Sequence, residues 1–173
     1  QAACNALIGA LGILAGSQGT MNNFVWGNET FQNYETIAGG TGAGPSFNGC
    51  DAVQTHMTNT KMTDPEILEK RFPVRLRTFA IRGGSGGAGA YRGGHGALRR
   101  LEFLTDVTVT TLCSHRVIPP FGVAGGDSGA TGQNWAELPD GSRVELKGND
   151  EIDLPAGSIF GLATPGGGGW GAA

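Results

Sequence analysis

A polar stretch between residues 34 and 64 carries the side chains best suited to chemistry. It holds Glu35, His56 and Asp64 among many hydroxyl and amide side chains. An imidazole titrates near neutral pH and can act as a base or a metal ligand, and a positioned carboxylate can transfer protons. These three residues are therefore the candidate catalytic groups.

Each candidate also has a purely structural interpretation. His56 can be locked into a hydrogen-bonded loop, and we favour this role because a lone imidazole makes a poor metal site. Strand alternation places Glu35 on the opposite face from Thr36, so Glu35 is either solvated or buried facing a pocket. Asp64 precedes Pro65 and fits a helix N-cap. The sequence leaves these alternatives open.

A glycine-rich loop at residues 39–45 lies inside the same stretch. Glycine can take positive φ and lets backbone N–H groups approach a ligand, so the loop could form a concave site for a carboxylate or phosphate oxygen. It could equally let the chain turn where strands crowd. On the first interpretation, the substrate-binding candidates are the loop glycines and the nearby polar residues: Thr36, Gly40, Gly42, Gly44, Asn59 and Thr60.

Other glycine motifs imitate known sites but lack their context. Residues 84–89 fit G-x-G-x-x-G and residues 83–87 fit G-x-S-x-G, but the glycines that follow exclude the helix that either motif needs. A flexible turn linker is the preferred interpretation there. Residues 126–129 match the Gly-Asp-Ser-Gly of trypsin-like proteases, but no histidine is placed to complete a triad. No P-loop motif occurs, so ATP phosphates would not be held by one here.

Composition places the candidates in one small domain. The chain has 173 residues, 39% of them apolar, which is enough for a hydrophobic core. Its net charge is -3 and its 12 Lys and Arg residues are dispersed, so neither nucleic acid nor an anionic membrane is indicated as a partner. The apolar start follows no basic residue and is too short to span a bilayer. We therefore expect a cytoplasmic protein.

The cysteines suggest neither cross-links nor a metal. Cys4, Cys50 and Cys113 are odd in number and far apart, and no Cys-x-x-Cys pair occurs. A disulfide framework or a zinc site is therefore not supported. We expect all three to be small buried thiols and expect no metal site in this chain.

Residues 2–14 predict a helix that is apolar on every side, and no charged residue occurs before Glu29. Such a helix must be buried all round, which a chain of this length seldom achieves with its own terminal helix. The chain also begins at Gln1 without an initiator Met. We infer a piece of a larger polypeptide, or a subunit whose first helix packs into a partner.

A second, short helix is predicted over residues 65–71. Thr63 and Glu66 fit a capping box, while Asp64 and Pro65 fit an N-cap followed by proline in the first helical position. The remaining pattern is β, and a hairpin turn is expected at residues 139–141. The strand candidates are residues 24–26, 31–37, 74–81, 98–104, 107–113, 134–138, 143–146 and 158–163.

Short strands joined by glycine turns predict an α+β fold that is mainly β, a glycine-rich antiparallel sandwich or partial barrel with a buried N-terminal helix and one short capped helix. Residues 1–72 would supply the helix, the polar glycine-rich loop and the short capped helix. Residues 73–173 would form the antiparallel β-rich segment. We expect the two segments to make one compact unit.

Five stretches carry a more specific signal. In order along the chain they are MNNFVWGNETFQNYETIAGGTGAGP, THMTNTKMTDPEILEKRFPVRL, GGSGGAGAYRGGHGALRRLEFL, PPFGVAGGDSGATGQNW and TPGGGGWG. Together they resemble the C-terminal part of the hydantoinase B family. That family includes N-methylhydantoinase beta subunits, the C-terminal half of ATP-dependent 5-oxoprolinase, and subunits similar to those of acetone and acetophenone carboxylases.

The resemblance implies part of an ATP-dependent amidohydrolase that acts on a cyclic amide, most typically opening 5-oxoproline to glutamate. ATP with Mg would bind outside this chain, in a hydantoinase A-type subunit or domain that phosphorylates the amide oxygen. Any metal would lie in the N-terminal part of hydantoinase B. The implied partners are these two portions and a small-molecule substrate, in an oligomeric enzyme. This chain alone would then hold no cofactor and be inactive.

Two alternatives remain beside this interpretation. The chain could belong to an ATP-dependent carboxylase of the acetone or acetophenone type, or be a non-catalytic assembly module with all chemistry elsewhere. The sequence also departs from the family pattern twice. His95 stands where an acidic residue is common, and Ser114-His115-Arg116 stands where Asp-Arg-Arg is common.

Overall fold

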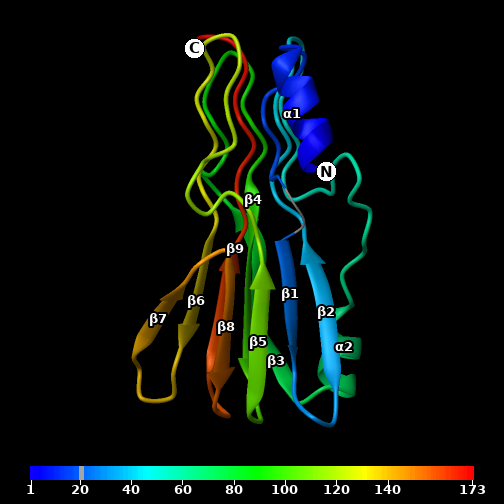
Figure 1. Ribbon diagram of the computed structural model, residues 1–173, viewed down its shortest axis with the longest axis vertical. Helices are drawn as coiled ribbons and strands as arrows, with labels where there is room; N and C mark the ends of the chain where they lie inside the picture. Colours follow the sequence, from blue (N-terminus) through cyan, green and yellow to red (C-terminus); the bar gives the residue numbers. More distant parts are fainter. Residues whose placement is uncertain (20–21) are drawn as a thin grey trace.

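The computed structural model describes residues 1–19 and 22–173. Its helices and strands are arranged around two layers of β-structure, with long extended segments above them (Figure 1). In chain order they are α1 (Ala2–Ala10), β1 (Asn22–Gly27), β2 (Gln32–Ile37), α2 (Pro65–Arg71), β3 (Val74–Arg82), β4 (Gly96–Phe103), β5 (Val107–Leu112), β6 (Gln133–Glu137), β7 (Arg143–Leu146), β8 (Asn149–Leu154) and β9 (Ile159–Ala163).

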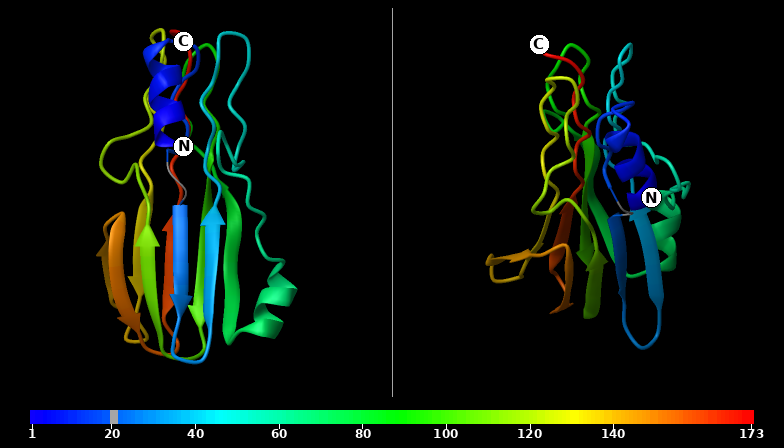
Figure 2. Two further views of the ribbon diagram at one scale, coloured as in Figure 1. Left: turned by 45° about the vertical axis from the view of Figure 1, so that its right-hand side comes forward. Right: turned by 45° about the horizontal axis from the view of Figure 1, so that its top comes forward.

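The strands form two antiparallel sheets that pack face to face (Figure 2). One sheet has the order β2-β1-β5-β8 and the other the order β3-β4-β9-β6-β7. Because β1 pairs with β5, the two halves of the chain share a sheet. The predicted α+β, mainly β sandwich is confirmed, and it is open rather than a partial barrel.

Aromatic side chains fill the part of the core farthest from α1. Along β4, buried and half-buried residues alternate, as expected for a strand with one face in the core. Phe24 stacks on Phe160 across the two sheets with ring centroids 4.9 Å apart, and Trp26 contacts Phe103 at 5.5 Å. These rings bury large apolar areas and hold the sheets together.

The short helix α2 begins where proline and aspartate predict. Asp64 is the N-cap, its carboxylate accepts the Glu66 N–H at 2.9 Å, and Pro65 is the first helical residue. The alternative capping box starting at Thr63 is wrong, because Asp64 occupies the cap. Leu68 anchors the helix in the core.

Strand β8 was not predicted from the sequence. Its outward positions are acidic and hydrogen-bond to threonines of β5: Thr108 donates to Asp153 at 2.6 Å and Thr110 to Glu151 at 2.9 Å. The hairpin turn before β7 forms as expected, with Gly141 at φ 85 and its N–H donating to Leu138 at 2.9 Å. With Ile152 and Leu154 as its two apolar residues, β8 has too short an apolar pattern to be recognised as a strand.

Above the sandwich, extended glycine-rich segments pack into what we call the glycine bundle, residues 15–18, 39–44, 85–95, 120–130 and 165–171 (Figure 1). Successive residues of the last segment bond to different neighbours. Gly167 donates to Gly94, Gly168 to Gly16 and Gly169 to Asp127, each at 2.8–2.9 Å. Three residues beyond Gly167, Trp170 returns to the segment of Gly94 by donating to Tyr91 at 2.9 Å. A repeat of three residues is that of an extended polyproline-type helix.

Only glycine fits at the centre of this bundle. A Cβ on Gly167 would lie 1.8 Å from the Thr41 carbonyl oxygen, and one on Gly168 would lie 1.9 Å from that of Phe121. Residues 83–84 do make an exposed turn. The expectation of a flexible linker is wrong beyond it, because the backbone from residue 85 onward is hydrogen-bonded within the bundle.

Helix α1 is shorter than predicted and turns its apolar side chains outward. It ends at Ala10, before Gly12 with φ 61. Asn5 is its buried residue and accepts hydrogen bonds from the N–H and hydroxyl of Ser17 at 3.0 and 3.3 Å. Leu7 is 62% exposed. Within this chain the helix is therefore not buried, and its packing against another part of a larger polypeptide or against a partner stays a prediction.

Two further expectations concern the cysteines and the membrane. Cys113 is buried, but Cys4 is only partly covered and Cys50 is exposed, so the prediction of three buried thiols is wrong for Cys50. Cys50 lies in the loop beside the bundle, where no strand covers it. In the part of the chain that the structure describes, no helix is long and apolar enough to cross a bilayer.

Candidate functional site

Glu35 lies inside the sandwich and pairs with Arg99. Its strand β2 places it opposite Phe24, with its side chain between the two sheets. Both carboxylate oxygens accept from the guanidinium: Nε to Oε2 at 2.9 Å and Nη2 to Oε1 at 2.7 Å. The two side chains are 2% and 1% exposed. Glu35 is thus buried, but its carboxylate faces Arg99 and not a pocket.

The environment of Glu35 is that of a structural ion pair. Burial raises the pKa of Glu35, while the nearby Arg99 charge and its hydrogen bonds oppose that rise. A two-pronged contact of this kind fixes the positions of both side chains, and here it ties β2 of one sheet to β4 of the other. No cavity identified among the described residues is lined by Glu35.

His56 lies in an exposed turn that two threonines lock. Thr55 donates its N–H to the Thr58 hydroxyl at 2.9 Å, and this hydroxyl donates to the Thr55 carbonyl at 2.8 Å. His56 itself has φ 52, and partial burial lowers its pKa. Its imidazole forms no hydrogen bond within the described residues. This geometry matches the favoured interpretation of a hydrogen-bonded loop.

The remaining polar candidates lie apart from one another: Thr36 is buried in β2, whereas Asn59, Thr60 and Asp64 are exposed in the segment that leads to α2. Asp64 uses its carboxylate to cap that helix, and Asn59 is exposed. Thr36 and Thr60 approach each other through Gln54, whose amide donates to the Thr36 carbonyl and to the Thr60 hydroxyl, both at 3.2 Å. The structure thus joins these two threonines, but it brings none of the three predicted catalytic groups together.

The glycine candidates belong to the glycine bundle. Gly40 donates its N–H to Pro165 at 3.0 Å, and Gly44 donates to Phe47 at 3.1 Å. A Cβ on Gly42 would lie 1.8 Å from the Ala15 carbonyl oxygen. None of these three glycines has a positive φ. These contacts favour close packing over a concave anion site.

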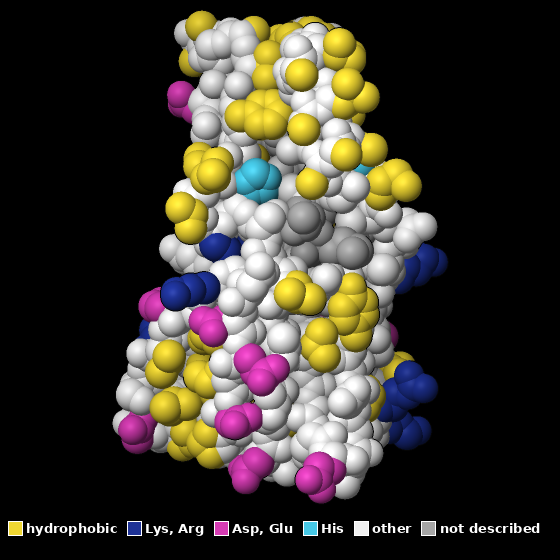
Figure 3. All heavy atoms as spheres, in the orientation of Figure 1, with side chains coloured by type: hydrophobic (Ala, Val, Ile, Leu, Met, Phe, Trp, Pro, Cys, Tyr) yellow, Lys and Arg dark blue, Asp and Glu magenta, His cyan; other side chains and the backbone are white. Residues whose placement is uncertain are grey.

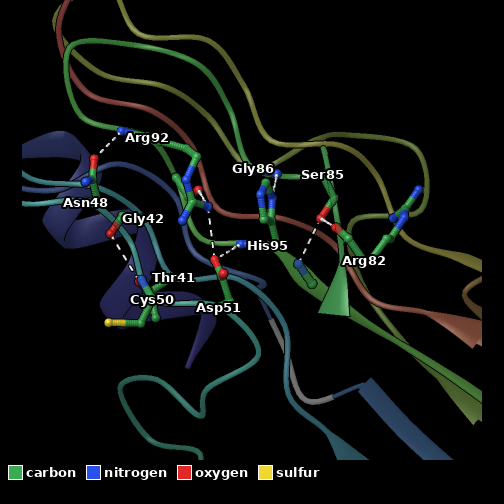
Figure 4. A network of polar contacts seen from close by, with 12 residues as sticks. Thr41, Gly42, Asn48, Cys50, Asp51, Arg82, Ser85, Gly86, Arg92 and His95 are labelled. Atoms are coloured by element: carbon green, nitrogen blue, oxygen red, sulfur yellow. Dashed lines mark hydrogen bonds and ion pairs between the residues drawn. The ribbon is translucent and has the colours of Figure 1, made fainter. Parts of the chain in front are cut away.

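A polar network anchors the base of the glycine bundle (Figure 4). Asp51 accepts from the His95 N–H at 2.7 Å and from Arg92 at 3.0 Å. Burial acts to raise the pKa of Asp51, but these donors outweigh it and leave the pKa lowered. The His95 Nδ1 accepts the Gly86 N–H at 2.9 Å, so the neutral ring carries its proton on Nε2. His95 therefore fastens the two ends of the 85–95 segment to each other and ties this segment to Asp51.

The glycine motif at residues 84–89 does not form a phosphate site. The G-x-G-x-x-G stretch spends its donors internally, since Gly86 donates to His95 and Gly87 donates to Gly167 at 2.9 Å. The strand that follows leaves no helix N-terminus for phosphate. Within residues 1–19 and 22–173, no three His, Cys, Asp or Glu residues gather as a metal site.

Sequence reasoning missed the surroundings of Arg116. Its guanidinium donates to Asn134 of β6 at 2.8 and 3.1 Å and to Asn22 of β1 at 3.0 Å. Arg116 therefore clamps the two sheets, and burial lowers its pKa. The described residues include no carboxylate in an ion pair with it. The signal was the Ser-His-Arg stretch, but its partners lie too far away in sequence to be paired from the pattern.

The loop at residues 113–118 around Arg116 borders three cavities. It lines cavities of about 280, 430 and 270 Å³. Val117 and Ile118 at its tip are 89% and 74% exposed. His115 holds the loop in shape, with Nδ1 2.6 Å from the Ile118 carbonyl oxygen. The arrangement presents apolar side chains on a rigid loop and offers no pair of groups suited to acid-base catalysis.

The architecture is that of a mainly β protein, an open two-sheet sandwich topped by a glycine bundle. Similarity to known proteins shows the family. Residues 1–173 match the hydantoinase B/oxoprolinase family, and the chain belongs to that family. It is 46% identical over 96% of its length to a 5-oxoprolinase of Dictyostelium discoideum. It is 47% identical over 99% of its length to 5-oxoprolinase 1 of Arabidopsis thaliana.

The relatives are much longer than this chain. It spans 13% of the Dictyostelium protein and 14% of the Arabidopsis protein. Among solved structures, the ATP-dependent caprolactamase from Pseudomonas jessenii has the same fold, with a TM-score of 0.74 and 21% identity over 92% of this chain. The match covers 30% of the caprolactamase chain.

Proposed function

We propose that this chain is the C-terminal part of an ATP-dependent hydrolase that opens 5-oxoproline to glutamate. The observation that carries the proposal is the identity of 46% and 47% to two 5-oxoprolinases over nearly the whole chain. An N-methylhydantoinase-like activity on a related cyclic amide is the nearest variant of the same proposal. The cytoplasmic location and the oligomeric state expected from the sequence stay predictions.

The test is an assay of the complete protein. Purified enzyme should release glutamate from 5-oxoproline only when ATP and Mg are supplied, with equal rates in the presence and absence of bicarbonate. Water-dependent turnover of a hydantoin instead would favour the N-methylhydantoinase-like variant. ATP use that requires bicarbonate would refute the hydrolase and favour the carboxylase alternative.

Within that enzyme, we propose that this chain acts mainly as an assembly module. Glu35 and Asp64 are both engaged in internal contacts, and Gly42 is packed against backbone. Four of the predicted polar candidates are exposed, namely His56, Asn59, Thr60 and Asp64. Thr60 accepts from Gln54 and Asp64 caps α2. His56 and Asn59 are therefore the candidates whose side chains could still reach a substrate held by another portion. ATP and any metal would bind in a hydantoinase A-type portion and in the N-terminal part of hydantoinase B.

Alanine substitutions in the complete enzyme separate the two roles. His56→Ala and Asn59→Ala should keep turnover within about twofold, because surface substitutions away from a site have small effects. Glu35→Ala should lower the amount of folded enzyme while leaving the KM of the folded fraction unchanged. A large fall in kcat for His56→Ala with normal folding would return residues 34–64 to a shared active site.

A further inference from the structure

Helix α1 turns small and polar side chains toward the rest of this chain and apolar side chains toward solvent. Its inward side is small or polar: Asn5 bonds to Ser17, and Gly9 packs so closely on Phe121 that a Cβ would lie 2.4 Å from the ring. Its outward side carries Leu7, and Leu11 follows as the C-cap; each is 62% exposed. A surface helix of a complete domain shows the opposite arrangement.

The loop at residues 113–118 lies beside α1 and also exposes large apolar side chains. A cavity of about 270 Å³ is lined by both elements, with Ala2 and Ala6 on the helix and His115 on the loop. We use the term apolar face for the exposed set Leu7, Leu11, Ile13, Val117 and Ile118. In Figure 3 the part of the molecule around α1 shows many hydrophobic side chains and few charged ones, whereas carboxylates gather over the strands below.

We infer that the apolar face is a permanent interface with the remainder of the same larger polypeptide, the hydantoinase B-type portion that this chain lacks. Large apolar side chains gathered on a surface mark an interaction site, and these five are 55–89% exposed. Obligate interfaces are the ones that resemble a domain core cut in half. Residues 1–28 contain no charged side chain that would favour exposure of α1 to water.

The length of the relatives identifies the occupant. This chain spans 14% of the Arabidopsis enzyme, and its fold accounts for 30% of the caprolactamase chain. The caprolactamase chain is the shorter of the two, and the part of it outside the match is still more than twice as long as the matched part. A segment of the same polypeptide is held at high effective concentration and needs no second copy. The inference depends on family membership and length, and it stands independently of the proposed substrate.

Hydrogen exchange in the complete wild-type protein is the primary test. The amides of α1 should exchange at least tenfold more slowly than those of a helix in open solvent, because the face is covered. Exchange at the open-solvent rate would overturn the inference without any variant being made. This readout does not depend on activity, so an inactive but assembled protein would refute the proposed function alone.

Paired variants then locate the contact. Leu7→Glu with Leu11→Glu, and separately Val117→Glu with Ile118→Glu, should each abolish the protection of α1 and expose the chain to limited proteolysis. The matched control is Leu104→Glu with Leu112→Glu. Those leucines are 47% and 51% exposed and lie outside the apolar face, so the control should behave as wild type.

The oligomeric state distinguishes the other occupant. If the face joined two copies, the first pair of variants would halve the mass measured by light scattering, and wild-type protection of α1 would fall on dilution. Either result would overturn the inference. The inference is supported if both paired variants keep the wild-type mass but lose the protection of α1, while the control variant keeps both.

Discussion

Breaking the buried pair of Glu35 and Arg99 should destabilise the sandwich strongly. We consider three variants of the complete protein: Glu35→Leu, Arg99→Met and the two together. Each single change leaves one charge inside the sheets, where both side chains are at most 2% exposed. The double change replaces the pair with apolar side chains of similar size.

The magnitudes differ between the single and double variants. Removing one partner of a buried pair costs about 3–5 kcal/mol, because an uncompensated charge remains, whereas a well-packed apolar replacement of both is often neutral. For a domain of this size, 1 kcal/mol corresponds to about 2–4 °C in Tm. The single variants should therefore lose about 6–20 °C, and the double variant should recover most of that loss.

Calorimetry measures the transition, and hydrogen exchange at β2 and β4 assigns it to the sandwich. The reasoning is refuted if Glu35→Leu unfolds at the wild-type temperature, or if the double variant is less stable than both single variants. Wild-type stability with lost turnover would instead make Glu35 a catalytic group.

The pKa of Glu35 adds a pH dependence to the same test. Burial raises the folded-state pKa above the ordinary value of 4.5. The folded protein therefore binds this proton more readily than the unfolded chain. Stability from this group is fully present below about pH 4.5 and is lost as the pH rises through the raised pKa. Glu35→Gln should remove this part of the pH dependence in a series of unfolding curves.

Two further predictions concern single side chains. In the native protein, Cys50 should react rapidly with a thiol reagent, whereas Cys113 should stay unlabelled until the protein unfolds, because burial covers its thiol and raises its pKa; equal labelling rates would contradict the fold around β5. Asp64→Ala should cost about 1 kcal/mol by removing the cap of α2, and Asp64→Asn much less; equal losses in thermal unfolding would show that the cap contributes nothing.

Most strands of the sandwich could be predicted because the alternation of apolar and polar residues lies within each strand. Residues 74–81 and 143–146 were identified by spacing alone and match β3 and β7 closely. The same alternation could place Glu35 on the face opposite Thr36, but it could not show what meets it there. Its partner Arg99 is 64 residues away. The site candidates therefore needed the tertiary structure, whereas the strands did not.

The glycine bundle shows the limit of local reasoning most clearly. Its hydrogen bonds join segments far apart in the chain, as between Gly168 and Gly16. A glycine that permits close approach and a glycine that permits a turn look the same in a sequence. For α1, the absence of charge predicted burial on all sides, but the sequence did not show that Asn5 faces this chain while Leu7 faces outward.

Gly42→Ala tests the bundle directly, with Gly83→Ala as its control. Both change glycine to alanine without requiring a positive φ, so backbone conformation is not the variable. At Gly42 the new Cβ would lie 1.8 Å from the Ala15 carbonyl oxygen, whereas at Gly83 nothing lies within 4 Å. Overpacking typically costs 1–3 kcal/mol, and here the obstacle is backbone, so we expect at least about 3 kcal/mol.

Gly83→Ala should instead be neutral or raise stability by about 0.4–1 kcal/mol, because alanine restricts the unfolded chain. Thermal unfolding and the KM for 5-oxoproline, measured on both variants of the complete enzyme, separate the two roles of the loop. A bundle glycine lowers the Tm and leaves the KM of the folded fraction unchanged. The opposite result would be a raised KM at normal Tm for Gly42→Ala, with Gly83→Ala unaffected. It would show that the loop contacts the substrate and that close packing does not explain the glycine at position 42.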